Sequence, residues 1–294
     1  MSLLPAAWPI PRPARRRITP ILRAALPFVA EYGVERRLSG PDPQVDLGLR
    51  VERAQAAALA RAPLLAAPRD RLLRRFVRAW STAPALARVP RLFLELDLPP
   101  GAPAPGWALF ATVEDVFSPR TRATLIRAVG ERFELGAEQL SALLAGARTP
   151  GLHLLHVGLL PARPGSPVRL ALSGPTAIAS QLALGLAPDA VRLFSWLAGP
   201  TLSVQLSYDQ AGACLGRVDL ELSRPQGLGG ALLALEAAGL VTAHARAELE
   251  AIEPAELSHL KLIVRQGRSP ELKAYVAAPA GPPSSGRGRA RRAR

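Results

Sequence analysis

The chain has 294 residues, about half of them apolar, and a formal net charge of +14. This length and apolar content exclude a largely disordered protein and allow a substantial hydrophobic core. The single cysteine, Cys214, excludes an internal disulfide and a multi-cysteine metal cluster.

Much of the positive charge lies at the two ends of the chain. Segments 1–17 and 281–294 contain clustered arginines among Pro, Ala, Gly and Ser, and no acidic residue. We therefore expect a flexible basic leader over 1–17 and a disordered basic tail over 281–294, on either side of a single domain over 18–280. Such ends would touch nucleic acid only weakly and without sequence specificity.

The sequence also contains no sign of a membrane protein or a secreted one. No apolar run approaches the roughly 18 residues that a membrane-spanning helix needs. The N-terminal arginines follow the apolar start of the chain, whereas in a secretory signal they would precede it. A cytoplasmic protein is expected.

In chain order, the pattern predicts a helix followed by two strands, five times over. Helical patterning covers 19–29, 53–84 (with a break at 63–68), 119–147, 175–198 and 227–251. The strand pairs that follow these helices are 31–38 with 44–51, 91–98 with 107–113, 151–160 with 167–173, 201–208 with 214–222, and 257–265 with 271–277. Because short turns join the two strands of each pair, the sheet is antiparallel and the fold class is α+β.

The strands alternate between aliphatic and polar residues. In the strand over 91–98, leucines occupy one face, while Arg91, Phe93, Glu95 and Asp97 occupy the other. The aliphatic face is expected to lie under the helices. The polar face would either meet bulk water, as in an open sheet, or line the lumen of a closed ten-stranded barrel, which leaves no exposed edges.

The two lysines of the chain, Lys261 and Lys273, lie on the two strands of the last predicted hairpin. In a composition that uses arginine for almost every positive charge, a retained lysine suggests a need for the compact charge of an ammonium group, as beside a phosphate oxygen. Chance survival of two lysines in a surface hairpin is an equal alternative. Tyr275 follows on the same face as Lys273.

Five helix–hairpin units and the Lys273-Ala-Tyr275 motif resemble the ABBA aromatic prenyltransferases, the PT-barrel family. That resemblance implies a ten-stranded antiparallel barrel with helices outside. It also implies prenyl transfer from an allylic diphosphate to an aromatic or peptide acceptor in specialised metabolism. The chain departs from the family's repeated tyrosines in having only Tyr32, Tyr208 and Tyr275, and Tyr208 falls on the helix-facing side.

The resemblance assigns roles to particular residues. Glu95 would take up the proton released from the acceptor, and Asp97 would orient the acceptor or help to bind Mg²⁺ in a metal-dependent variant. No other cofactor or metal site is expected. The candidates for binding the diphosphate are Lys261, Lys273, Tyr275, Arg169, Arg217 and His259.

Two other interpretations remain open at this stage. A protein with the same barrel would bind a small molecule or a partner peptide without catalysis, and the scarcity of aromatic residues favours it. An open α+β sheet would bind RNA through its basic ends, with a steep dependence on salt concentration.

Overall fold

The computed structural model describes residues 3–8, 10–39, 44–62, 65, 70–98, 106–113, 118–163, 165, 167–223, 228–253 and 255–280. The predicted tail over 281–294 lies outside these residues. Within them the strands are β1 (Glu31–Arg37), β2 (Val45–Glu52), β3 (Arg91–Asp97), β4 (Gly106–Thr112), β5 (His153–Leu159), β6 (Val168–Pro175), β7 (Thr201–Tyr208), β8 (Cys214–Ser223), β9 (Leu257–Arg265) and β10 (Arg268–Pro279).

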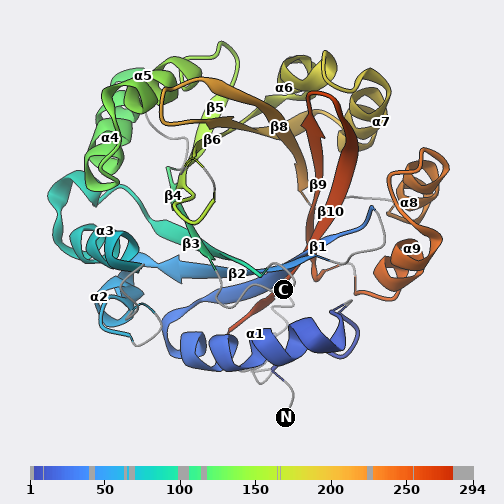
Figure 1. Ribbon diagram of the computed structural model, residues 1–294, viewed down its shortest axis with the longest axis horizontal. Coiled ribbons are helices and arrows are strands. Elements are labelled where there is room, and N and C mark those ends of the chain that lie inside the picture. Colours follow the sequence, from blue (N-terminus) through green and yellow to red (C-terminus); the bar gives the residue numbers. More distant parts are fainter. Residues whose placement is uncertain are drawn as a thin grey trace, which may run out of the picture.

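These strands form a closed antiparallel barrel in which each strand pairs with its neighbours in sequence and β1 pairs with β10. Figure 1 looks down the barrel and shows the strands around a central lumen, with the helices outside. The predicted fold is therefore confirmed. The alternative of an open sheet is wrong, because the first and last strands, Glu31–Arg37 and Arg268–Pro279, pair along their length.

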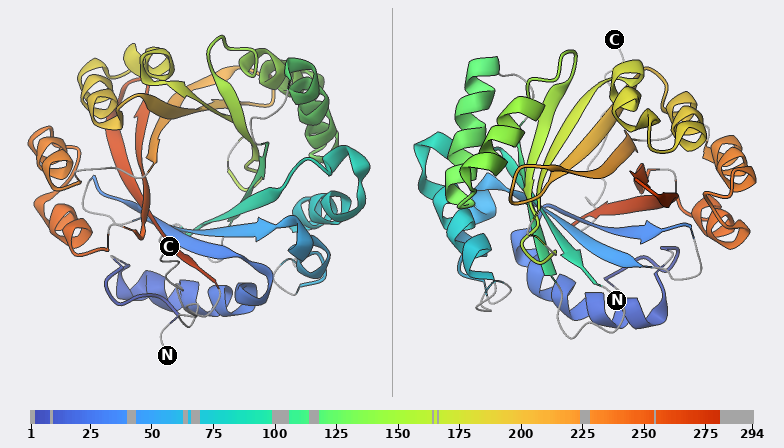
Figure 2. Two further views of the ribbon diagram at one scale, coloured as in Figure 1. Left: turned by 180° about the vertical axis from the view of Figure 1, so that it is seen from behind. Right: turned by 45° about the horizontal axis from the view of Figure 1, so that its top comes forward.

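The helices form a single outer layer around the barrel, as the views in Figure 2 show from behind and from above. The α-helices are α1 (Arg12–Ala25), α2 (Ala56–Leu59), α3 (Arg71–Thr82), α4 (Pro119–Arg132), α5 (Ala137–Gly146), α6 (Thr176–Leu184), α7 (Pro188–Ala198), α8 (Leu228–Ala237) and α9 (Ala243–Glu250). Short 3₁₀ turns are η1 (Leu26–Phe28), η2 (Arg53–Gln55) and η5 (Pro84–Leu86). No helix in the described part of the chain is both long enough and apolar enough to cross a membrane.

Each of the last three predicted helices is in fact a pair of helices. Local breaks separate the members: Glu134 adopts a positive φ before α5, Pro188 begins α7, and Gly239 adopts a positive φ before α9. A left-handed residue cannot continue a right-handed helix, and proline is favoured at a helix start. Because Ala/Leu-rich patterning continues across these breaks, the sequence pattern alone suggested one long helix.

The N-terminal segment also differs from the prediction of a flexible leader. Helix α1 begins at Arg12, and Leu4 and Trp8 are buried. The Arg15 guanidinium donates hydrogen bonds to the backbone oxygens of Leu4, Pro5 and Trp8, and the Trp8 indole donates to Glu256. The described part of 1–17 is thus held by a buried aromatic anchor and backbone contacts, which a count of arginines cannot reveal.

The main hydrophobic core lies between the barrel and the helices. In β3, for example, Leu92, Leu94 and Leu96 are fully buried on the outer face. Alternation then directs the residues between these leucines, among them Glu95, into the lumen. The fold therefore concentrates ionisable side chains from distant parts of the sequence inside one barrel.

Candidate active site in the barrel lumen

A cavity of about 330 Å³ occupies part of the lumen. Of the predicted site residues, Glu95, Lys261, Tyr275 and His259 line it. The lining also includes Phe93, Phe110, His156, Glu31, Glu35, Arg50, Gln205 and Glu221. The lining therefore combines many charged and polar side chains with a smaller aromatic and aliphatic part.

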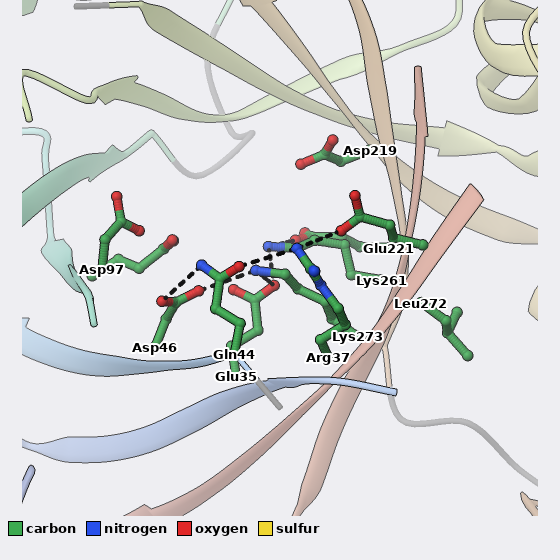
Figure 3. Close-up of polar contacts among 12 residues, drawn as sticks. Glu35, Arg37, Gln44, Asp46, Asp97, Asp219, Glu221, Lys261, Leu272 and Lys273 are labelled. Carbon is green, nitrogen blue, oxygen red and sulfur yellow. Dashed lines mark hydrogen bonds and ion pairs between the residues drawn. The ribbon is translucent and has the colours of Figure 1, made fainter. Parts of the chain in front are cut away.

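The two lysines are adjacent, as predicted, because Lys261 and Lys273 are partners in the register of β9 and β10. Both are buried, and both already have carboxylate partners. The Lys261 Nζ atom lies 3.2 Å from Glu35 and 3.1 Å from Glu221, and both contacts are to Oε1. Figure 3 shows this cluster viewed among the strands of the barrel.

Lys273 lies on the side of this cluster away from the cavity lining. Its Nζ atom donates a hydrogen bond to Asp46 Oδ2 at 3.0 Å and lies 3.5 Å from Glu35 Oε1. Burial alone would lower the pKa of each lysine. The pKa is nevertheless raised, for Lys261 by Glu35 and Glu221 and for Lys273 by Glu35 and Asp46. Conversely, the two ammonium groups outweigh burial and lower the pKa of Glu35. The two lysines and Glu35 are therefore charged at neutral pH.

The ring of Tyr275 lies between His259 of β9 and the glycines of β1 and β2. It stacks on His259 with centroids 4.7 Å apart and an angle of 13° between the planes. On the opposite side, Gly33 and Gly48 face each other across β1 and β2, and a Cβ atom on Gly48 would lie 2.3 Å from the Tyr275 hydroxyl. Glycine is thus required there to seat the tyrosine.

Tyr275 is the one tyrosine of the chain that enters the lumen. Tyr32 lies outside the barrel, where its hydroxyl donates to the Leu3 carbonyl, and Tyr208 packs outside against Gly146 of α5, as its position in β7 predicted. Burial raises the pKa of Tyr275, as do nearby carboxylates, of which Glu31 contributes most. Tyr275 therefore stays a neutral hydrogen-bond donor across the physiological pH range.

The two predicted catalytic carboxylates, Glu95 and Asp97, share an arginine that sequence reasoning missed. Arg163 belongs to the turn between β5 and β6, and its side chain reaches β3. It donates to Glu95 Oε1 at 2.6 Å and to both oxygens of Asp97 at 2.6 and 2.8 Å. Burial raises the pKa of Glu95 against the lowering effect of Arg163. Glu95 lines the cavity, whereas Asp97 lies outside its lining.

Arg169 and Arg217, predicted to bind diphosphate, lie outside the cavity lining and contact Asp219 instead. Arg217 makes a two-pronged contact with Asp219 at 2.6 and 2.7 Å. Arg169, only 3% exposed, lies 3.6 Å from Asp219 and donates to Ser207 and Gln205. Burial lowers the pKa of Arg169 to about 10. These arginines are therefore already occupied by internal partners.

Several lumenal residues escaped the sequence analysis although strand alternation could have found them. Asp46 and Phe110 alternate with buried aliphatic residues in β2 and β4, and Glu35 follows the buried Val34 in β1. His156 required more than alternation, because a register shift between Leu154 and His156 resets the faces of β5. Arg163 lies in a turn, where no periodicity applies.

No family model matches the sequence, and no curated protein matches it. Solved structures do match the fold. The 5-dimethylallyltryptophan synthase from Streptomyces coelicolor superposes with a TM-score of 0.59 at 17% identity, covering 92% of this chain and 93% of that one. The protein therefore has the fold of the aromatic prenyltransferases.

Two other prenyltransferases support the same conclusion. Prenyltransferase PriB in its apo form gives a TM-score of 0.58 at 16% identity, with 92% of this chain and 91% of that one covered. NotF, in complex with brevianamide F and DMSPP, gives 0.57 at 9% identity, with 93% and 82% covered. The predicted resemblance to the PT-barrel architecture is thus confirmed at the level of the fold.

Proposed function

We propose that the protein transfers a prenyl group from an allylic diphosphate to an aromatic acceptor inside the barrel. The observation that carries this proposal is the pairing of Lys261 with Lys273 beside the stacked Tyr275, at the edge of a cavity that Glu95 also lines. The neighbouring structures add support, since the Streptomyces coelicolor enzyme was solved with DMASPP and Trp.

In this proposal the two ammonium groups and the Tyr275 hydroxyl donate to the diphosphate oxygens. They stabilise the negative charge that develops on the leaving group as the C–O bond to the prenyl carbon breaks. The incoming diphosphate must displace Glu35 from the lysines, because Glu35 Oε1 lies within 3.5 Å of both. A ligand with several negative charges can compete with one carboxylate for two cations.

A divalent cation would make that exchange easier. Glu35, Asp46 and Glu95 each offer a carboxylate oxygen, and these atoms lie within 4.8 Å of one another. Hard oxygen donors of this kind fit Mg²⁺, and Glu35 and Asp46 would hold it, which leaves Glu95 unbound for its role as a base. Bound there, Mg²⁺ would neutralise charge on the diphosphate oxygens. Dependence on Mg²⁺ is therefore part of the proposal.

The remaining lining residues suit the second half of the reaction. Phe93 and Phe110 present aromatic surface to the cavity, which favours an allylic cation. As the new bond forms between the prenyl carbon and the acceptor, the acceptor loses a proton, and Glu95 takes it. A raised pKa suits this role, because a general base works best when its pKa approaches the operating pH.

A second candidate function is ligand binding without catalysis. It is favoured by the occupation of both lysines, and of Arg163, Arg169 and Arg217, by internal carboxylates. A lumen already neutralised in this way needs no anionic ligand to be stable.

The test is an assay of prenyl transfer with dimethylallyl and geranyl diphosphate. Aromatic acceptors would include tryptophan, both free and within a dipeptide, with either Mg²⁺ or a chelator. We expect a product with the mass of one added prenyl group, together with stoichiometric release of diphosphate. Lys261→Met should reduce the rate on the order of 100-fold, whereas Arg127→Met, on the exposed surface of α4, should leave it unchanged.

Absence of product and of diphosphate release with every donor and acceptor would reject prenyl transfer and leave the binding function. Equal rates with Mg²⁺ and with the chelator would reject the metal requirement alone. A Lys261→Met enzyme as active as the wild type would place the diphosphate elsewhere in the barrel.

A further inference from the structure

The lining of the lumenal cavity carries more negative than positive charge. Its carboxylates are Glu31, Glu35, Glu95 and Glu221, and its cations are Arg50 and Lys261. The two histidines that line it add no positive charge at neutral pH, because burial lowers the pKa of His156 to about 4 and also lowers that of His259. A purely diphosphate-binding cavity would be expected to show the opposite balance.

Each cation at this site serves two carboxylates. Lys261 contacts Glu35 and Glu221, and Lys273, behind the lining, contacts Asp46 and Glu35. Sharing of this kind leaves the carboxylates only partly compensated.

The same pattern holds for the arginines. Arg50 contacts Glu31 at 3.0 Å and Glu52 at 3.2 Å, and Arg163 serves two carboxylates of β3, as described above. One carboxylate between two cations occurs both at Asp219, outside the cavity lining, and at Glu35, within it. The lining as a whole still holds four carboxylates and two cations.

The contacts of these carboxylates also leave oxygens available. The hydrogen bonds and ion pairs of Glu35, Glu95 and Glu221 with described residues fall on Oε1 in each case. Glu35 and Glu95 have carboxylate oxygens within 4.8 Å of each other. Glu221 lies close to Glu35, because both contact the Nζ atom of Lys261. These three carboxylates of the cavity lining thus converge on Lys261 and Glu35.

Aromatic surface lies next to this group of carboxylates. Phe93 is two residues from Glu95 on the same face of β3 and pairs with Phe110 on β4. Both line the cavity, as does Tyr275. Faces of aromatic rings attract organic cations and also stack with aromatic ligands.

We propose that this cavity binds an aromatic amine in its ammonium form. The ammonium group donates to Glu35, Glu95 and Glu221, and the ring of the ligand packs against Phe93 and Phe110. The added cation compensates the carboxylates that share Lys261. The inference rests on the proposed function only in taking the lumen as the ligand site; if transfer occurs, the amine is the acceptor.

The test compares three ligands with the same phenylpropyl carbon skeleton that differ in charge. Isothermal titration calorimetry at pH 7.5, without diphosphate or metal, would measure binding of 3-phenylpropan-1-amine, 3-phenylpropan-1-ol and 3-phenylpropionate to the full chain. Because charge-assisted hydrogen bonds are stronger than neutral ones, we expect the amine to bind at least about 10-fold more tightly than the alcohol. The carboxylate should bind most weakly.

Substitution of a lumenal carboxylate tests whether the preference for the amine over the alcohol arises in the cavity. Glu221→Gln should weaken amine binding about 10-fold and leave binding of the alcohol unchanged. Glu131→Gln, exposed on α4, is the matched control and should change neither. Where Glu221→Gln does not fold, Glu95→Gln provides the same comparison.

Binding of 3-phenylpropionate as tightly as the amine would overturn the proposal, and so would failure of the amine to bind at all. A preference for the amine that survives both lumenal substitutions would also overturn it. These outcomes are separate from the transfer assay, because no diphosphate is present. If the amine binds preferentially but no prenyl transfer occurs, the protein is a binding protein for aromatic amines. If prenyl transfer occurs without a preference for the amine, the proposed enzyme activity stands and the proposal of amine binding falls.

Discussion

Two clusters of charged residues lie in the same barrel, and in each of them one carboxylate lies between two cations, arginines in one cluster and lysines in the other. At Asp219 one carboxylate lies between Arg169 and Arg217, outside the cavity lining. At Glu35 one carboxylate lies between Lys261 and Lys273, at the edge of the cavity. Both clusters are buried and contain groups that ought to be costly to bury.

The difference lies in how replaceable each contact is. The planar guanidinium of Arg217 holds both oxygens of Asp219 in a fixed two-pronged geometry. The ammonium groups of Lys261 and Lys273 are compact charges, and each has a second carboxylate besides Glu35. We infer that the Asp219 cluster maintains the barrel, whereas the Glu35 cluster can exchange partners with a ligand.

The largest expected effect is that of Asp219→Asn. The substitution leaves the buried Arg169 and the partly buried Arg217 without their carboxylate, and loss of one partner of a buried ion pair costs roughly 3–5 kcal/mol. Urea denaturation followed by circular dichroism would measure the free energy of unfolding. The exposed Asp189→Asn on α7 is the control and should be nearly neutral. A loss below about 1 kcal/mol would mean that the arginines find other partners, and the comparison would fail.

A smaller effect is expected for Glu35→Gln, although Glu35 is buried, as is Asp219. Lys261 keeps Glu221 and Lys273 keeps Asp46, so the free energy of unfolding should fall by only about 1–2 kcal/mol. The same denaturation experiment gives this value directly beside that of Asp219→Asn. If Glu35→Gln proves the more destabilising of the two, the Glu35 cluster is the structural one.

The smallest expected effect is a dependence of stability on pH that arises at the cavity. Burial lowers the pKa of His156 to about 4. Between about pH 6.5 and pH 4 the unfolded chain then binds more protons at this residue than the folded chain, so stability falls as the pH falls. His156→Gln should reduce the loss of unfolding free energy between pH 7 and pH 5 by about 1 kcal/mol.

His153 is the matched control for that measurement, because it is exposed on the same strand. His153→Gln should leave the pH profile as it is in the wild type. Identical profiles for His156→Gln and the wild type would show that water reaches His156 in the folded protein.

Much of the fold could be predicted from local patterns. In β3 the leucines alternate with charged residues, and this period of two places Glu95 on the face opposite the helices without knowledge of any other strand. The pairing of Lys261 with Lys273 followed from the short turn of the last hairpin. The Ala/Leu-rich helices were found, but the breaks at Glu134 and Gly239 were not, because tolerance of left-handed backbone is a local property that bulk patterning hides.

By itself, therefore, the sequence determined the strands, their faces and their hairpins, since alternation and turn chemistry act over a few residues. Only the tertiary structure decided which lumenal residues meet. Closure of β1 on β10 brings Glu35 beside Tyr275, and the turn between β5 and β6 carries Arg163 to Glu95. These partners depend on barrel closure and on the path of a loop, neither of which leaves a periodic signal in the sequence.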